Sequence, residues 1–137
     1  MSIQTRIEKL NEAGNKTLLD VIDELKSIFP HGHDGFIPMS IQEMDLHSRK
    51  NKDYAGGGRP TGNFDRVGAI VSMYPDVKWG KPQNVAMFYA LKQLDAYLWL
   101  ENGDRDGEVE GKDARLGDIS VYSKIIRLIM RDKKNKR

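Results

Sequence analysis

Three charged residues, Lys92, Asp95 and Asp118, fall where two predicted helices should be apolar. At about 100° per residue, Lys92 and Asp95 lie within about 40° of Phe88 and Trp99, inside the apolar arc of one helix. Asp118 lies at the centre of the apolar arc of the following helix. Burying a charge is costly unless the charge is paired, ligates a metal ion or faces a wet cavity. These three side chains therefore need a partner.

Two kinds of partner fit this pattern. One is a salt bridge of Lys92 with Asp95 or Asp118, or simple helix capping by Asp118, which follows Gly117. The other is a ligand in a polar pocket at the centre of a helical bundle, where such folds usually place their binding sites. The residue types alone leave both explanations open.

The segment from Lys50 to Arg66 joins basic side chains to a glycine-rich loop. Glycines let backbone N–H groups approach an anion closely, and a helix that begins near Asn63 would favour a phosphate at its N-terminus. No Gly-Lys-Ser/Thr follows and no strand precedes, so the loop is neither a Walker A motif nor a dinucleotide fingerprint.

Two other polar runs are weaker candidates. Glu43, His47, Lys50 and Tyr54 share one stripe of a predicted helix, which an ordinary solvated face would also produce. The run His31-Gly-His33-Asp34 contains residue types that ligate metals. Because His47 is the only other histidine, we assign no metal site to this run.

Several short motifs together resemble a known family. They are Lys52-Asp53-Tyr54 before the glycine-rich turn, Asn63-Phe64-x-Arg66, Leu91-Lys92, and Asp118-Ile119-x-x-Tyr122. Over about residues 46–128 the chain resembles the small, phage-encoded relatives of the MazG-like, all-α nucleotide pyrophosphohydrolases. The resemblance implies a helical bundle that assembles as a homo-oligomer in the host cytoplasm and binds a nucleotide.

The resemblance also implies roles for individual residues. Catalytic members of the family hold Mg²⁺ with paired Glu-x-x-Glu and Glu-x-x-Asp motifs, and the metal activates water against the phosphate bridge. Here Asp95 and Asp118 are the candidate catalytic residues and Mg²⁺ ligands, with Glu43 and Asp53 as possible additions. This set is smaller than the paired motifs of the family. The remaining ligand-binding candidates are Lys50, Lys52, Arg59, Arg66 and Lys92 for phosphates, Tyr54 or Phe64 for stacking, Asn63 for a sugar or base edge, and Asp53 and Tyr122.

The elements that must position these residues are all predicted to be helical. Apolar periodicity predicts helices over residues 15–29, from 38 or 40 to about 54, and over 64–74, 85–100 and 118–130, and an additional apolar-periodic segment begins at Ile3. Thr17, Asn63 and Asn84 are the expected caps, and Pro30 should end the first of these helices. We therefore predict an all-α single domain of about five helices over residues 1–130. An acidic, mobile insertion should follow residue 100, and a frayed basic tail should form residues 131–137.

Composition limits the possible functions. The chain has 137 residues, no cysteine and a net charge of +2, so disulfides, thiolate zinc sites and cysteine nucleophiles are excluded. Membrane spans and signal peptides are not predicted, and a cytoplasmic protein is the expectation. Nucleic acid is not an expected main partner, since the basic charge is confined to the tail. Three hypotheses remain: nucleotide binding with possible hydrolysis, non-catalytic sequestration of a nucleotide-derived signal of host defence, and a structural or interaction protein.

Overall fold

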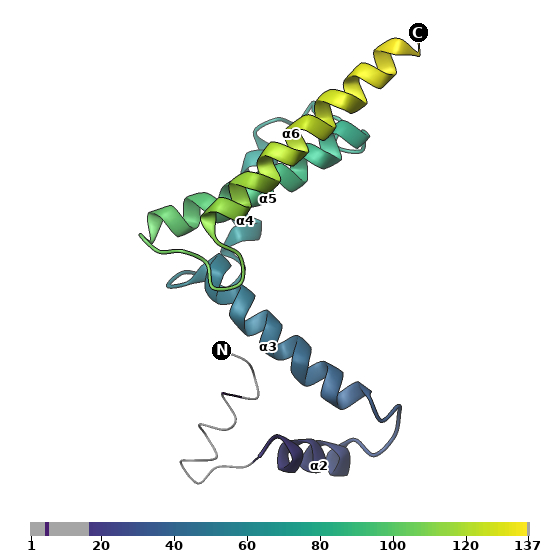
Figure 1. Ribbon diagram of the computed structural model, residues 1–137, viewed down its shortest axis with the longest axis vertical. Coiled ribbons are helices and arrows are strands. Elements are labelled where there is room, and N and C mark those ends of the chain that lie inside the picture. Colours follow the sequence, from purple (N-terminus) through teal and green to yellow (C-terminus); the bar gives the residue numbers. More distant parts are fainter. Residues whose placement is uncertain (1–4, 6–16, 137) are drawn as a thin grey trace. The chain divides into compact units, whose positions relative to one another are not determined.

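The computed structural model describes Thr5 and residues 17–136 (Figure 1). Within these residues there are five helices and no strand. The helices are α2 (Leu18–Ile28), α3 (Phe36–Ala55), α4 (Gly62–Ser72), α5 (Pro82–Asn102) and α6 (Lys112–Asn135). The predicted all-α class with about five helices is confirmed. The segment expected to begin at Ile3 lies outside the described residues, except for Thr5.

Contacts divide the chain into two compact units, Met1–Arg49 and Lys50–Arg137. The boundary falls within α3, so the last residues of α3 belong to the second unit. The predicted single domain over residues 1–130 stays a prediction. Across the described residues, no helix is both long enough and apolar enough to cross a bilayer.

The first unit is built from α2 and most of α3. Thr17 caps α2 with a full capping box, in which the Thr17 hydroxyl accepts from the Asp20 N–H and the Asp20 carboxylate accepts from the Thr17 N–H. The predicted Thr17 cap is confirmed, and α2 ends at Ile28, two residues before Pro30. Helix α3 begins earlier than expected because Pro38 fits its first turn, where a proline costs no hydrogen bond.

The second unit centres on the hairpin of α5 and α6, which lie side by side in Figure 1. Polar contacts tie both ends of the hairpin together. Lys112 at the start of α6 pairs with Glu101 at the end of α5, with 2.7 Å between Nζ and Oε1. At the other end, Lys133 Nζ donates to Gln83 Oε1 at 2.8 Å. The two helices therefore run antiparallel along their whole length.

Small and apolar side chains form the buried centre of the second unit. Ala90, Ala96 and Leu100 of α5 are buried, and so is Val67 of α4. Alanines on the buried face have small side chains, so the neighbouring backbones approach closely. The apolar core between the helices is therefore small. Polar side chains occupy much of the remaining interior.

Helix ends in the second unit differ from the predicted ones. Lys81 precedes α5 and Pro82 occupies its first turn, where the fixed φ of proline suits a helix. Asn84 is not the cap and instead donates its amide to the Lys78 carbonyl. Asn63 is not a cap either, because α4 begins at Gly62 with Thr61 before it.

Helix α6 is much longer than predicted at both ends. It begins at Lys112 and continues through Asn135, so the segment expected to fray is helical over residues 131–135. The expectation of a frayed tail is wrong for these residues, since the helix continues beyond the apolar stripe and Lys133 contacts α5. The acidic insertion is shortened to a loop between α5 and α6, and hydrogen bonds hold that loop in place.

Candidate functional site

A buried arginine, Arg115 of α6, organises the polar interior of the second unit. Its side chain is only 2% exposed. Its Nη1 atom donates to Tyr54 Oη at 3.0 Å and to Gln93 Oε1 at 2.8 Å, and pairs with Glu110 Oε2 at 2.8 Å. The guanidinium also lies over the Tyr54 ring, 4.8 Å from its centroid. The end of α3, the middle of α5 and the start of α6 are thus held by one cation.

Gln93 extends this network to a predicted site residue. Its carbonyl oxygen accepts from Arg115, and its amide nitrogen donates to Asp118 Oδ2 at 3.0 Å. A glutamine can bridge a cation and a carboxylate because it carries both an acceptor and a donor. Tyr54, a predicted ligand-binding residue, and Asp118, a predicted catalytic residue and metal ligand, therefore belong to one hydrogen-bonded chain.

A second charged cluster joins α4 to α5. Arg66 binds Asp95 with two parallel hydrogen bonds, 2.6 Å from Nε to Oδ1 and 3.0 Å from Nη2 to Oδ2. Asp95 is only 6% exposed. The Arg66 guanidinium also stacks on the Trp99 ring, 4.0 Å from its centroid. Gly58 of the glycine-rich loop approaches the same ring, since a Cβ there would meet Trp99 Cζ2 at 2.6 Å.

The partner of Asp95 is therefore Arg66 and not Lys92. Lys92 is exposed on α5 and makes no hydrogen bond or ion pair with any described residue. The predicted salt bridges of Lys92 with Asp95 or Asp118 are absent from the described part of the chain. The capping role considered for Asp118 is also wrong, because α6 begins six residues earlier.

Asp53, another predicted ligand-binding residue, holds the loop between α5 and α6. The residue is only 2% exposed, and its carboxylate accepts from the backbone N–H groups of Glu108, Val109 and Glu110 at 2.7, 2.8 and 3.3 Å. Its carbonyl oxygen also accepts from Arg105 Nη2 at 2.8 Å. Asp53 thus provides an acceptor for three loop N–H groups and fixes the acidic loop between α5 and α6 to the end of α3.

Two more carboxylates stabilise the same loop. Asp106 Oδ1 accepts from the backbone N–H groups of Lys112 and Gly107, and these hydrogen bonds hold the pKa of Asp106 below its ordinary value. Lys52 pairs with Glu108 at 3.2 Å and lowers the pKa of that carboxyl. Lys52 therefore contacts the loop, although the sequence suggested a phosphate for it.

The first turn of α4 brings two predicted phosphate ligands together. An ideal Cβ on Gly62 would lie 3.1 Å from Arg66 Nη1 and 3.7 Å from the Arg59 Cβ. Arg59 is exposed and pairs with Asp65 at 3.1 Å. Arg66 Nη1 makes no hydrogen bond to a described residue, because the contacts to Asp95 use the other two nitrogens. The Arg66 guanidinium and the base of the Arg59 side chain thus lie beside a buried glycine at a helix N-terminus.

The other candidates are more scattered. Phe64 is 69% exposed, and at 100° per residue it lies about 200° around α4 from Arg66, on the opposite side. The Asn63 Oδ1 atom is buried with no hydrogen-bond partner among the described residues. Tyr122 packs edge-on against Tyr89, with 5.9 Å between the ring centroids. Lys50 is exposed.

The predicted metal ligands do not gather. Within residues 17–136 and Thr5, no group of three or more His, Asp or Glu side chains is placed to hold a metal ion. Both oxygens of Asp95 are engaged by Arg66, whereas Asp118 accepts from Gln93. Glu43 belongs to the first unit and is exposed.

Sequence reasoning missed Arg115, Gln93 and Trp99. Arg115 fell in the segment predicted to be a mobile insertion, so it was not considered as part of a helix. Gln93 is uncharged and Trp99 looked like an ordinary core residue. A signal was nevertheless present for Trp99, because it lies one turn after Asp95 on the same helix face.

Comparison with protein-family models, with curated proteins and with solved structures gives no match for this chain.

Proposed function

We propose that the second unit binds a nucleoside phosphate without hydrolysing it, with the phosphate at the first turn of α4 between Arg59 and Arg66. The observation that carries this proposal is the placement of Arg66 Nη1 beside Gly62. A phosphate there would accept from both guanidinium groups and lie at the positive end of the α4 dipole. The missing Cβ of Gly62 lets the Arg66 guanidinium lie close to the backbone at the start of α4.

The fixed position of Arg66 favours this role. Its two bonds to Asp95 and its stacking on Trp99 immobilise the guanidinium before any ligand arrives. Binding then costs less side-chain entropy than ordering a mobile arginine would. The carboxylate of Asp95 balances part of the Arg66 charge, so Arg59 must supply much of the attraction for the anion. The Arg59–Asp65 pair is exposed and weak, and a phosphate would compete for it readily.

The carboxylate contacts favour binding over hydrolysis. To ligate Mg²⁺, Asp95 would have to give up a bidentate ion pair that is largely shielded from water. The same exchange would release Arg66 from the position that the proposed phosphate site requires. If Asp95 stays bound to Arg66, Asp118 is the only carboxylate of the predicted pair that could ligate a metal ion. A non-catalytic binding protein, such as one that sequesters a nucleotide, does not need this rearrangement.

Calorimetry with a panel of ligands tests the proposal. The panel holds nucleoside mono-, di- and triphosphates, cyclic nucleotides, the matching nucleosides and inorganic pyrophosphate, each with and without Mg²⁺. We expect at least one phosphorylated nucleotide to bind, its nucleoside to bind far more weakly, and the ligand to be recovered intact. Arg59→Gln should weaken binding about tenfold, as expected for a lost hydrogen bond between charged groups.

Arg127→Gln is the matched control, because it removes the same charge from an exposed position on α6. Equal losses in the two variants would show general attraction and overturn the site. Absence of binding by every phosphorylated ligand would overturn the function. Release of pyrophosphate with Mg²⁺, abolished by Asp118→Ala, would replace non-catalytic binding by the hydrolase hypothesis.

A second candidate function, self-association, is favoured by one observation. Val121, Ile125 and Leu128 of α6 are all exposed, at spacings of four and three that place them on one helix face. Such an apolar stripe is a usual sign of a surface that another protein covers. A second copy of α6 would bury the stripe against itself across a two-fold axis.

Analytical ultracentrifugation over a concentration series tests this second candidate. Ile125→Asp should shift the protein towards the monomer, because it places a charge within the stripe. Ser123→Asp, which adds the same charge on the opposite side of α6, should leave the distribution unchanged. A wild-type protein that stays monomeric at all concentrations would exclude self-association through this stripe.

A further inference from the structure

The C-terminal half of α6 presents a row of basic side chains that none of the proposed functions uses. Four exposed residues form this row, which we call the basic stripe: Lys124, Arg127, Arg131 and Lys134. Their spacings of three, four and three residues place them within about 80° of one another around the helix. A frayed tail would scatter these charges, whereas a helix that continues through Asn135 holds them on one face.

The basic stripe faces away from α5. Two α6 residues that contact α5, Lys133 and Tyr122, lie about 140–160° around the helix from the centre of the basic stripe. In Figure 1 the C-terminal turns of α6, in yellow, project from the hairpin. All members of the basic stripe except Lys124 line, together with Met130, an open hollow of about 250 Å³. Within the second unit, the basic stripe is therefore accessible to a large partner.

Acidic residues near the basic stripe are too few to balance its charge. Asp132 is the only acid in residues 119–136, and it lies about 120° around the helix from the centre of the basic stripe. The part of α5 that faces this half of α6, residues 82–94, contains no acid. The loop before it, residues 73–81, contains one acid and two lysines. No member of the basic stripe forms an ion pair with a described residue.

So many unpaired cations on one helix face are unfavourable by themselves. Like charges three or four residues apart repel each other and weaken a helix. The helix dipole compensates this repulsion at Lys134, which belongs to the last turn. Its effect fades before Arg127 and Lys124, which lie more than two turns earlier. A polyanion would relieve the repulsion along the whole basic stripe, so helix capping alone does not account for this arrangement.

The make-up of the basic stripe favours duplex nucleic acid over other polyanions. Its two arginines present planar forks that match the oxygens of a phosphate. A helix that binds an anionic membrane needs an apolar face beside its charges, and residues 131–136 contain no apolar side chain. A single strand would stack its bases on aromatic rings, and the basic stripe has none. Its length of about 15 Å corresponds to about four base pairs of a duplex.

We propose that the basic stripe of α6 binds the phosphate backbone of duplex nucleic acid without reading its base sequence. Each of the four cations would contact one phosphate, and such contacts carry no sequence information. The basic stripe shares no residue with the phosphate site at the start of α4. Duplex binding is therefore separate from the proposed binding of a nucleoside phosphate, and either can fail without the other.

Fluorescence anisotropy with a labelled DNA duplex tests this proposal. A duplex of mixed sequence is titrated with the full chain at several salt concentrations between about 50 and 200 mM. Each phosphate contact contributes about −0.9 to the slope of the logarithm of the binding constant against the logarithm of the salt concentration. Four contacts therefore predict a slope of about −3.6. A duplex of unrelated sequence and equal length should bind equally well.

Two substitutions test the position of the duplex. Arg131→Gln and Lys134→Gln should each make the slope less negative by about 0.9 and weaken binding about eightfold at about 0.1 M salt, as expected for one lost phosphate contact. Arg131→Lys keeps the positive charge and should retain the slope. Testing two positions keeps the proposal decidable if one substitution disturbs the fold, which circular dichroism reports.

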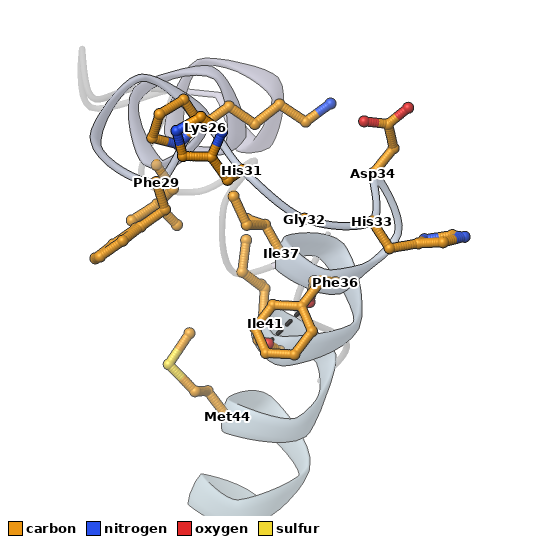
Figure 2. Close-up of a pocket in the computed structure, with 13 residues that line it drawn as sticks. Lys26, Phe29, His31, Gly32, His33, Asp34, Phe36, Ile37, Ile41 and Met44 are labelled. Carbon is orange, nitrogen blue, oxygen red and sulfur yellow. Dashed lines mark hydrogen bonds between the residues drawn. The ribbon is translucent and has the colours of Figure 1, made fainter.

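Lys26→Gln is the matched control for Lys134→Gln. It removes the same charge from the first unit, where Lys26 lines a pocket together with Asp34 (Figure 2). Because an acid lies in the same lining, we expect little attraction for a polyanion there, and the salt slope should not change. Arg59→Gln should weaken nucleotide binding and leave duplex binding unchanged, which separates the two proposals.

Three results would overturn the proposal. The first is no binding of the duplex at the lowest salt concentration. The second is an equal effect of Lys134→Gln and Lys26→Gln, which would indicate a general attraction between the protein and DNA. The third is tighter binding to another polyanion, namely the matching single strand, polyglutamate, or vesicles of phosphatidylcholine and phosphatidylserine.

Discussion

Replacing Asp95 by asparagine should destabilise the second unit by about 2–3 kcal/mol. The change keeps the shape of the side chain and removes the charge that faces Arg66 in the bidentate pair. Removing one partner of a buried ion pair usually costs about 3–5 kcal/mol. Because the Arg66 side chain is 31% exposed, water solvates the unpaired guanidinium in part. We therefore expect a loss below this usual range.

The reverse change should cost more. The Asp95 side chain is only 8% exposed, so Arg66→Met leaves the more buried charge without a partner. We expect the two single variants together to lose about 2 kcal/mol more of the free energy of unfolding than the double variant loses. The reason is that the double variant leaves no charge without a partner. The Arg66 stack on Trp99 contributes to the Arg66→Met loss alone and drops out of this coupling.

Urea denaturation followed by tryptophan fluorescence measures these free energies. Both tryptophans, Trp79 and Trp99, belong to the second unit, so the signal reports on the unit that carries the pair. The exposed pair of Arg59 and Asp65 provides the control cycle, and its coupling should be at most about 1 kcal/mol. Additive effects of the two Arg66 and Asp95 variants, within about 0.5 kcal/mol, would refute this account of the interior.

Three further predictions concern the loop between α5 and α6, and amide exchange or NMR of the loop measures each. Asp53→Ala should speed amide exchange at Glu108, Val109 and Glu110, because these three N–H groups lose their acceptor. Unchanged exchange would contradict the role of Asp53 in holding the loop. Gly107→Ala should open the loop, since a Cβ there would overlap the Glu110 carbonyl oxygen, and a retained wild-type spectrum would count against this geometry. Asp106 has a lowered pKa in the fold, so its stabilising effect is complete above its ordinary value of 3.8 and is lost as pH falls through the lower folded value. The Lys112 amide resonance should follow that titration, and Asp106→Asn should abolish the dependence.

Parts of the fold could be predicted because they depend on local chemistry. The Thr17 cap is one example, since a threonine followed three residues later by an aspartate carries its own hydrogen bonds. The ends of α6 could not be predicted in this way. Its first turns contain Arg115, whose place in a helix is stabilised by Tyr54 and Gln93 from other helices. Propensity and periodicity contain no information about such distant partners.

The site shows the same division. Sequence pattern singled out Asp95, Asp118 and Arg66 as polar residues with a specific role, and the structure places all three in hydrogen-bonded networks. It also singled out Lys92, which is exposed, because a helical wheel cannot tell which part of an apolar arc a neighbour covers. Asp53 appeared to be a ligand-binding residue, and the structure shows it holding a loop that begins about fifty residues later.

The sequence by itself determined the helical class, the approximate positions of the helices and the presence of charges that require partners. These follow from 3.6-residue periodicity, turn chemistry and the cost of burying a charge, which act within a few residues. Only the tertiary structure decided which partner each charge has. Lys92, Asp95 and Asp118 looked alike in sequence, yet one faces water, one binds Arg66 and one accepts from Gln93. That difference depends on which side chains the packing of α4, α5 and α6 brings within hydrogen-bonding distance.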